Sequence, residues 1–187
     1  SLLLSRVKTA SGAVRGAPEL AQRQGRTLKI ADRSVADRII GNTHKANASL
    51  VVRGIESYPK RLAQFDDAPV LLFAKGHLSL LQKDLVAMVG ARNASTNAIR
   101  LTAQRAKEIG EADYGIVSGL ARGIDRAAHI GSLATGTIGI IGCGIDVIYP
   151  QENSDLFDEM AKSGLILSEM VPATKPSPRN FPSRNRI

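Results

Sequence analysis

The sequence predicts an α/β protein in which a mostly parallel sheet follows a small helical piece. Between Asp84 and Ser168, apolar runs of about five residues alternate with segments long enough for a helix. Continuous apolar runs are typical of parallel strands covered on both faces, and the longer segments are typical of the helices that connect them. Residues 1–49 lack strand periodicity. The whole chain is 43% hydrophobic and 22% charged, as in folded globular proteins.

Residues 1–49 form the first predicted domain, a small helical one. Pro18 is expected in the first turn of a short helix, where its missing N–H costs nothing. Asp32 or Ser34 can cap a second helix, which runs from Val35 to about Ala46. This segment has too few large apolar residues to fold alone, so we interpret it as the remainder of a helical domain.

Residues 50–187 form the second predicted domain. Two strands come first, Leu50–Arg53 and Val70–Ala74. The alternating part then predicts strands at 85–89, 114–118, 137–141 and 165–168, and helices at about 96–109, 125–134 and 151–162. Right-handed crossovers bring the carboxyl ends of parallel strands to one edge of the sheet, which gives a Rossmann-like architecture.

Three glycine-bearing loops fall at that edge: Gly90–Arg92, Gly119–Asp125 and Gly142–Asp146. Ligands of open α/β sheets bind outside the carboxyl ends of the strands. Glycine lets backbone amides approach a phosphate, and Arg92 and Arg122 add permanent charge. Each loop alone could be a tight turn, but three on one edge favour phosphate binding. Such a crevice has few side chains that read bases, which predicts little sequence preference.

The sequence argues against common nucleotide sites. No Gly-x-x-x-x-Gly-Lys-Ser/Thr loop occurs. Gly142-Cys-Gly144 begins the Gly-x-Gly-x-x-Gly pattern of dinucleotide sites, but Val147 takes the place of the third glycine.

The sequence supports catalytic and metal sites less well than it supports phosphate binding. Ser118, Asp125 and His129 are the residue types of a catalytic triad, but we interpret Asp125 as a helix N-cap next to a histidine. Cys143 is interpreted as a small residue in a tight turn, with a thiolate nucleophile as the alternative. Three scattered histidines and one cysteine match no metal-ligand spacing, so we expect no metal.

A single cysteine and the lack of an apolar membrane span or leader predict a cytoplasmic protein.

The positive charge lies at the two ends of the chain. The net charge of +8 divides into +6 for residues 1–49, −2 for residues 50–174 and +4 for residues 175–187. The last segment surrounds Phe181 with arginines, and its prolines are expected to keep it extended. A ring among cations is typical of single-stranded nucleic-acid binding. A solvated connector remains the alternative.

Six segments together resemble the bacterial DprA/Smf family. The segments are Ile55-Glu-Ser-Tyr-Pro-Lys-Arg-Leu62, Gly90-Ala-Arg-Asn93, Ser118-Gly-Leu-Ala-Arg-Gly-Ile-Asp125, Gly144-Ile-Asp-Val-Ile-Tyr-Pro150, Gln151-Glu-Asn153 and Asn180-Phe-Pro-Ser-Arg-Asn-Arg-Ile187. The resemblance implies an extended Rossmann fold after a SAM-like helical piece. It also implies a cytoplasmic homodimer that binds and protects incoming single-stranded DNA and helps to load the RecA recombinase in natural transformation, with no catalytic residues and no cofactor.

The resemblance also implies site residues, position by position. The DNA phosphate-binding residues are Gly90, Ala91, Arg92, Ser118, Gly119, Arg122 and Gly123. The base-stacking and basic residues are Arg179, Phe181, Arg184 and Asn185. Ala91 stands where the family usually has serine, and Arg179 is the nearest cation where a lysine often precedes the phenylalanine. The family continues after Asn-Arg-Ile, so we expect residues beyond 187 to carry the dimer and RecA contacts.

Two other functions remain open. The fold is similar to that of nucleotide-processing enzymes of the lysine-decarboxylase-like group, although their Pro-Gly-Gly-x-Gly-Thr loop is absent here. A nucleotide sensor is the other alternative.

Overall fold

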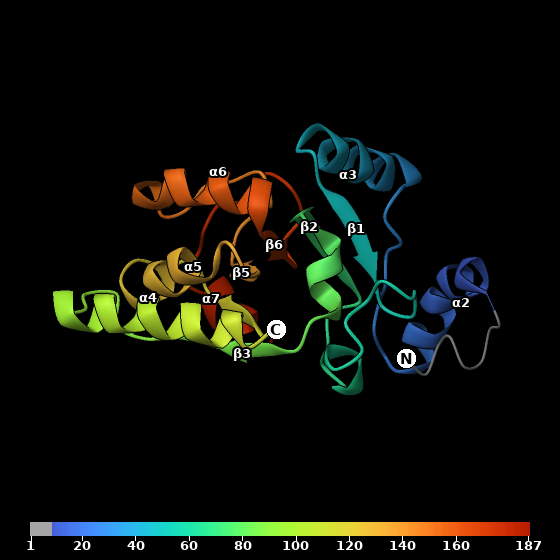
Figure 1. Ribbon diagram of the computed structural model, residues 1–187. Coiled ribbons are helices and arrows are strands. Elements are labelled where there is room, and N and C mark those ends of the chain that lie inside the picture. Colours follow the sequence, from blue (N-terminus) through green and yellow to red (C-terminus); the bar gives the residue numbers. More distant parts are fainter. Residues whose placement is uncertain (1–8) are drawn as a thin grey trace. The chain divides into compact units, whose positions relative to one another are not determined.

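The computed structural model describes residues 9–187 and divides into two compact units between Ile40 and Gly41 (Figure 1). Helix α2 (Ala10–Arg23) lies in the first unit, and α3 (Arg33–Lys45) begins there. Of the two predicted N-cap candidates of α3, Asp32 is the cap. Its carboxylate accepts a hydrogen bond from the Ser34 amide at 2.8 Å.

The predicted position of Pro18 is wrong. It lies inside α2, because the helix already begins after Thr9, whose hydroxyl accepts a hydrogen bond from the Gly12 amide at 3.1 Å. The N-cap side chain therefore sets the start of this helix, and the helix continues through a proline that removes only one internal hydrogen bond.

The second unit is built on a six-stranded sheet in the order β1-β2-β6-β5-β4-β3. The strands are β1 (Ser49–Val52), β2 (Leu71–Gly76), β3 (Leu85–Ala87), β4 (Gly115–Ser118), β5 (Thr137–Ile141) and β6 (Leu165–Ser168). Strands β3 to β6 are parallel, whereas β2 pairs antiparallel with β6 and β1 antiparallel with β2. The predicted mostly parallel α/β sheet is confirmed.

All three crossover helices cover the same face of this sheet, so the two-sided cover that the apolar strands predicted comes from helices on one face and from other segments on the opposite face. These helices are α4 (Thr96–Glu111), α5 (Ile124–Ser132) and α6 (Ser154–Ser163) (Figure 1). The order β3, β4, β5, β6 never reverses, so every right-handed crossover moves in one direction and leaves its helix on one side. Ile116 packs there against Ala106 of α4 and Ala128 of α5.

The other face packs against irregular chain. Its buried residues include Ile138, Ile140, Leu165 and Leu167, which belong to one cluster with Tyr58 and Leu62 from the segment between β1 and β2. This segment contains η1 (Leu62–Gln64), and η2 (Leu78–Gln82) follows β2. In the described part of the chain, no helix has the length and apolarity needed to span a membrane.

The prolines of the basic C-terminal segment predicted an extended chain, but the segment is not extended throughout. Residues Asn180–Arg184 form helix α7. Pro182 occupies the third helical position, where the backbone N–H has no partner within the helix, so the proline does not oppose the turn. Arg186 fixes the segment to the sheet, since its guanidinium donates to both carboxylate oxygens of Glu169 at 2.6 and 2.8 Å.

Candidate functional site

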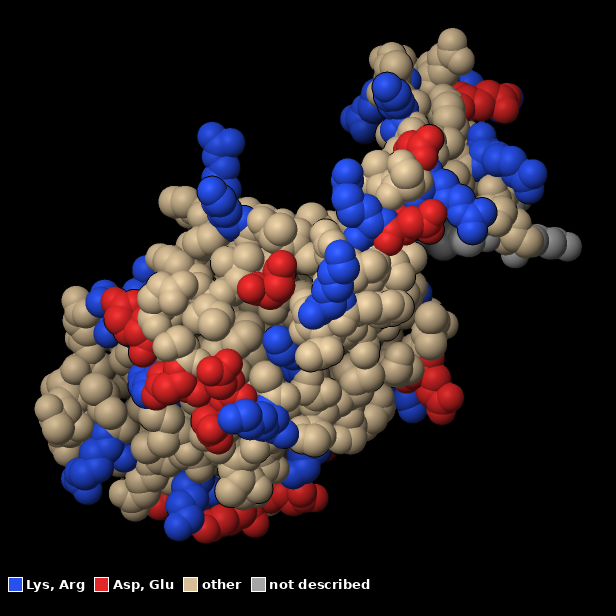
Figure 2. Space-filling view, turned by 90° about the horizontal axis from the view of Figure 1, so that it is seen from above, with Lys and Arg blue, Asp and Glu red and all other residues tan. Residues whose placement is uncertain are grey.

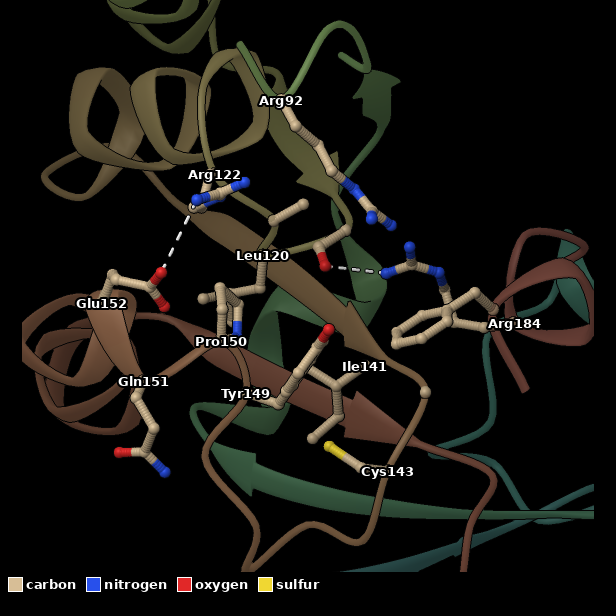
Figure 3. Close-up of a pocket in the computed structure, with 14 residues that line it drawn as sticks. Arg92, Leu120, Arg122, Ile141, Cys143, Tyr149, Pro150, Gln151, Glu152 and Arg184 are labelled. Atoms are coloured by element: carbon tan, nitrogen blue, oxygen red, sulfur yellow. Dashed lines mark hydrogen bonds and ion pairs between the residues drawn. The ribbon is translucent and has the colours of Figure 1, made fainter. Parts of the chain in front are cut away.

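A cavity of about 370 Å³ opens at the carboxyl ends of β3, β4 and β5, where the three glycine loops meet (Figure 3). Its lining residues are Arg92, Gly119, Leu120, Ala121, Arg122, Ile141, Gly142, Cys143, Tyr149, Pro150, Gln151, Glu152, Phe181 and Arg184. The structure therefore brings together five of the predicted site residues, from both loops that carry arginine and from the C-terminal segment.

In the lining of this cavity, the Phe181 ring contacts both a cation and a second ring. The Arg92 guanidinium carbon lies 5.8 Å from the centre of the Phe181 ring. The Tyr149 ring lies 5.7 Å away on centroids, tilted by 34°. Arg92 is exposed, and no described residue forms a hydrogen bond or ion pair with its guanidinium. Its donors are thus available to an anion, beside a ring that is only half-buried.

Arg184 is more constrained than Arg92. One of its terminal nitrogens donates to the carbonyl oxygens of Gly119, at 2.7 Å, and of Ile140. Burial lowers the pKa of this guanidinium, while the nearby Asp125 carboxylate opposes that shift. Arg184 therefore joins α7 to the ends of β4 and β5, and adds positive charge to the cavity wall.

The loop after β4 is held by side chains from two other positions. Leu120 has a φ of +56°, which is uncommon for a residue with a side chain. The Asp125 carboxylate accepts from the amides of Gly119 and Ala121, at 3.1 and 3.4 Å. The buried Asn153 amide donates to the carbonyls of Leu120 and Ala121, at 2.9 and 3.0 Å.

These contacts change the expected roles of two residues. Gly123, not Asp125, is the N-cap of α5, and Asp125 lies in its first turn. The Gly119 amide, which sequence reasoning assigned to phosphate, is bonded to Asp125 instead. The loop thus positions Arg122 rather than offering all of its amides to a ligand.

The other predicted phosphate-loop residues pack the two loops together. The Ser118 hydroxyl is buried and donates to the Met88 carbonyl at 2.5 Å. A Cβ at Gly90 would lie 2.8 Å from Ile124, and one at Gly123, where φ is +74°, would lie 2.3 Å from the Ala91 carbonyl oxygen. Glycine therefore leaves room for the Ile124 side chain at position 90, and a close backbone approach with a positive φ requires it at position 123.

Two predicted residues, Arg179 and Asn185, are exposed and do not line the cavity. Asn185 accepts a hydrogen bond from the neighbouring Arg184 at 3.0 Å. Sequence reasoning in turn gave no role to Tyr149, Gln151 and Glu152, although the segments around them contribute to the family resemblance. An aromatic residue shortly after a glycine loop was the available signal.

Positive charge does not dominate the α6 side of the second unit. Figure 2 shows acidic and basic side chains mixed on this face. Arg126 and Asp155, for example, form an ion pair at 2.5 Å. The cavity at the strand ends is therefore the better candidate for an anion site than this surface.

The catalytic alternatives receive no support from the geometry. His129 is buried, and its Nδ1 lies 2.7 Å from the Thr137 hydroxyl, which itself donates to the Ile116 carbonyl. The Ser118 hydroxyl is bonded to Met88, so the three residues do not form a triad. Burial raises the pKa of the Cys143 thiol to about 11, which keeps it protonated at neutral pH and unsuited to nucleophilic attack.

Because His129 is buried, we expect the stability of the protein to depend on pH in a specific way. Burial lowers its pKa to about 3 from an ordinary value of 6.5, so below pH 6.5 the unfolded chain binds this proton before the folded one. The free energy of unfolding should then fall by up to about 1.4 kcal/mol per pH unit between pH 6.5 and 5, and this contribution should be absent above pH 6.5.

Urea unfolding at several pH values measures this slope. His129→Leu should remove it, whereas His44→Gln, which changes an exposed histidine, should retain it. An identical slope in wild type and His129→Leu would contradict the assignment.

The fold defines an α/β protein of the Rossmann-like class, with a cavity at the carboxyl edge of the sheet. The chain belongs to the DNA recombination-mediator protein A family, whose model matches residues 49–187. This result confirms the DprA/Smf resemblance.

Individual relatives give the same result. The chain is 45% identical over 134 residues to the DNA processing protein DprA of Streptococcus pneumoniae, covering 71% of this chain and 47% of that protein. It is 40% identical over 153 residues to DprA of Bacillus subtilis, covering 80% and 52%. The chain thus spans about half the length of these relatives.

Two solved structures are similar to the chain. The X-ray structure of DprA from Streptococcus pneumoniae superposes with a TM-score of 0.75 at 37% identity, covering 83% of this chain and 54% of that one. A DprA structure from Helicobacter pylori, described for its single-stranded DNA binding mode, gives 0.68 at 33% identity, covering 74% and 62%.

Proposed function

We propose that the cavity at the carboxyl ends of β3–β5 binds single-stranded DNA. The observation that carries this proposal is the Arg92 guanidinium, which has no hydrogen-bond or ion-pair partner among residues 9–187 and whose carbon lies 5.8 Å from the centre of the half-buried Phe181 ring. A cation that can meet a phosphate beside a ring that can stack on a base suits an unpaired strand, whose bases are accessible. A duplex offers phosphates but no free base faces.

The relatives support this proposal. The family description names a recombination mediator, and the Helicobacter pylori protein is described by its single-stranded DNA binding. We extend the proposal to the role that the family resemblance implies. The protein protects incoming DNA and helps to load RecA as a cytoplasmic homodimer, without catalysing a reaction. Residues 1–49 serve as the helical SAM-like piece and residues 50–187 as the DNA-binding domain.

Salt dependence tests the electrostatic part of this function. Fluorescence anisotropy with a labelled oligo(dT) should give an association constant that falls with salt, with log K declining by roughly 0.7 per phosphate neutralised for each unit of log salt. A duplex of equal length should bind more weakly. A salt-independent association constant, or equal affinity for duplex and single strand, would contradict the proposal. Nucleotide hydrolysis in a parallel screen would favour the enzyme alternative.

A further inference from the structure

The cavity has two chemically different sides. Arg92 and Arg184 lie on one side, while Arg122 and Glu152 lie across the cavity from Arg184 (Figure 3). The Phe181 ring contacts Arg92, since its centre lies 5.8 Å from the guanidinium carbon. A carboxylate is an unexpected group in a site for a polyanion, because it repels phosphate. Its presence in the lining calls for a role other than phosphate binding.

Glu152 is free to accept hydrogen bonds from a ligand. Its carboxylate lies 3.6 Å from the Arg122 guanidinium, which is an ion pair but longer than a hydrogen bond. Among residues 9–187, no group donates a hydrogen bond to this carboxylate. Its side chain is 63% exposed and that of Arg122 is 50% exposed, so the pair is weak and open to rearrangement.

The space between the two sides suits a single nucleoside. The volume of about 370 Å³ lies near the lower end of the roughly 300–1,000 Å³ range of small-ligand sites. Apolar groups of Leu120, Ile141 and Pro150 line it, together with the Tyr149 ring. A base can pack against apolar walls of this kind while the phosphate of the same nucleotide remains near Arg92.

We propose that Glu152 reads the base that enters this cavity and favours bases carrying an amino group. This inference rests on the proposed binding of single-stranded DNA, and it names a specificity-determining residue for that same site. An ionised carboxylate only accepts hydrogen bonds. It therefore pairs with the 4-amino group of cytosine, as glutamate and aspartate do in other readers, and is repelled by the 4-oxygen of uracil or thymine.

With Glu152 in the cavity lining, a base preference is expected in place of little sequence preference. The expectation of little preference assumed a crevice of amides and arginines, but the Gly119 and Ala121 amides are bonded to Asp125. The segment after β5 contributes a carboxylate instead. A modest base preference follows, added to a phosphate-driven affinity.

Oligo(dC) and oligo(dU) of equal length give the sharpest comparison, because their bases differ in the groups on the 3- and 4-positions alone. At pH 8 we expect wild type to bind oligo(dC) about fivefold more tightly than oligo(dU), within the range seen for one good base contact. Glu152→Gln should bring the ratio to about one, because its amide both donates and accepts. It should also tighten binding of oligo(dU).

Glu159→Gln is the matched control. It removes one negative charge from α6 at an exposed ion pair with Lys162, outside the cavity lining. This variant should keep the fivefold ratio. A wild-type ratio near one, or an unchanged ratio in Glu152→Gln, would overturn the role of Glu152 while leaving DNA binding intact. Failure of wild type to bind either oligonucleotide would instead reject the proposed function.

Discussion

Arg92→Ala is expected to weaken single-stranded DNA binding by about tenfold to a hundredfold. The Arg92 guanidinium has no hydrogen-bond or ion-pair partner among the described residues, and lies 5.8 Å from the Phe181 ring, so its donors can meet a phosphate. Hydrogen bonds to charged groups contribute roughly 1.5–3 kcal/mol, and about 1.4 kcal/mol corresponds to a tenfold change. Titration of oligo(dT) by anisotropy measures the loss.

The stability of Arg92→Ala should stay within about 0.5 kcal/mol of wild type, because the side chain is exposed. Arg100→Ala removes the same charge from an exposed position of α4, outside the cavity, and should bind DNA nearly as well as wild type. The salt slope of Arg92→Ala should also decrease by about 0.7 if one phosphate contact is lost. Normal affinity in Arg92→Ala would show that the phosphate site lies elsewhere.

Local pattern was sufficient to predict the central strands. Residues 137–141 and 165–168 are continuous apolar runs, and both form buried parallel strands. The faces that the helices cover could not be predicted in the same way. That arrangement depends on the spatial order of the strands, which a single sequence pattern does not contain.

Side-chain contacts to the loop after β4, both local and long-range, also limited the prediction of the site. The glycine loops do meet at one edge, because parallel strands impose it. Which amides remain available was not predictable, since it depends on Asp125 and on Asn153, a residue more than thirty positions away from the loop it holds. The helix α7 was missed because proline is compatible with a first helical turn as well as with extended chain.

Substitution of Phe181 distinguishes a role of its ring in base stacking from a role in the core. The ring is half-buried, lines the cavity and lies beside Tyr149 and Arg92, whereas a fully buried core ring would have no face available to a base. Phe181→Ala should therefore reduce binding by roughly 1–3 kcal/mol. Its loss of stability should stay below the roughly 3–5 kcal/mol typical of a truncated core aromatic.

Two further variants complete this test. Phe181→Tyr keeps an aromatic face and should restore binding, and Phe65→Ala, which removes an exposed ring outside this cavity, should bind DNA normally. Thermal melting and anisotropy titration on the same samples separate the two effects. If Phe181→Ala melted far below wild type yet bound DNA normally when folded, the ring would belong to the core, and the stacking contact would have to come from Tyr149.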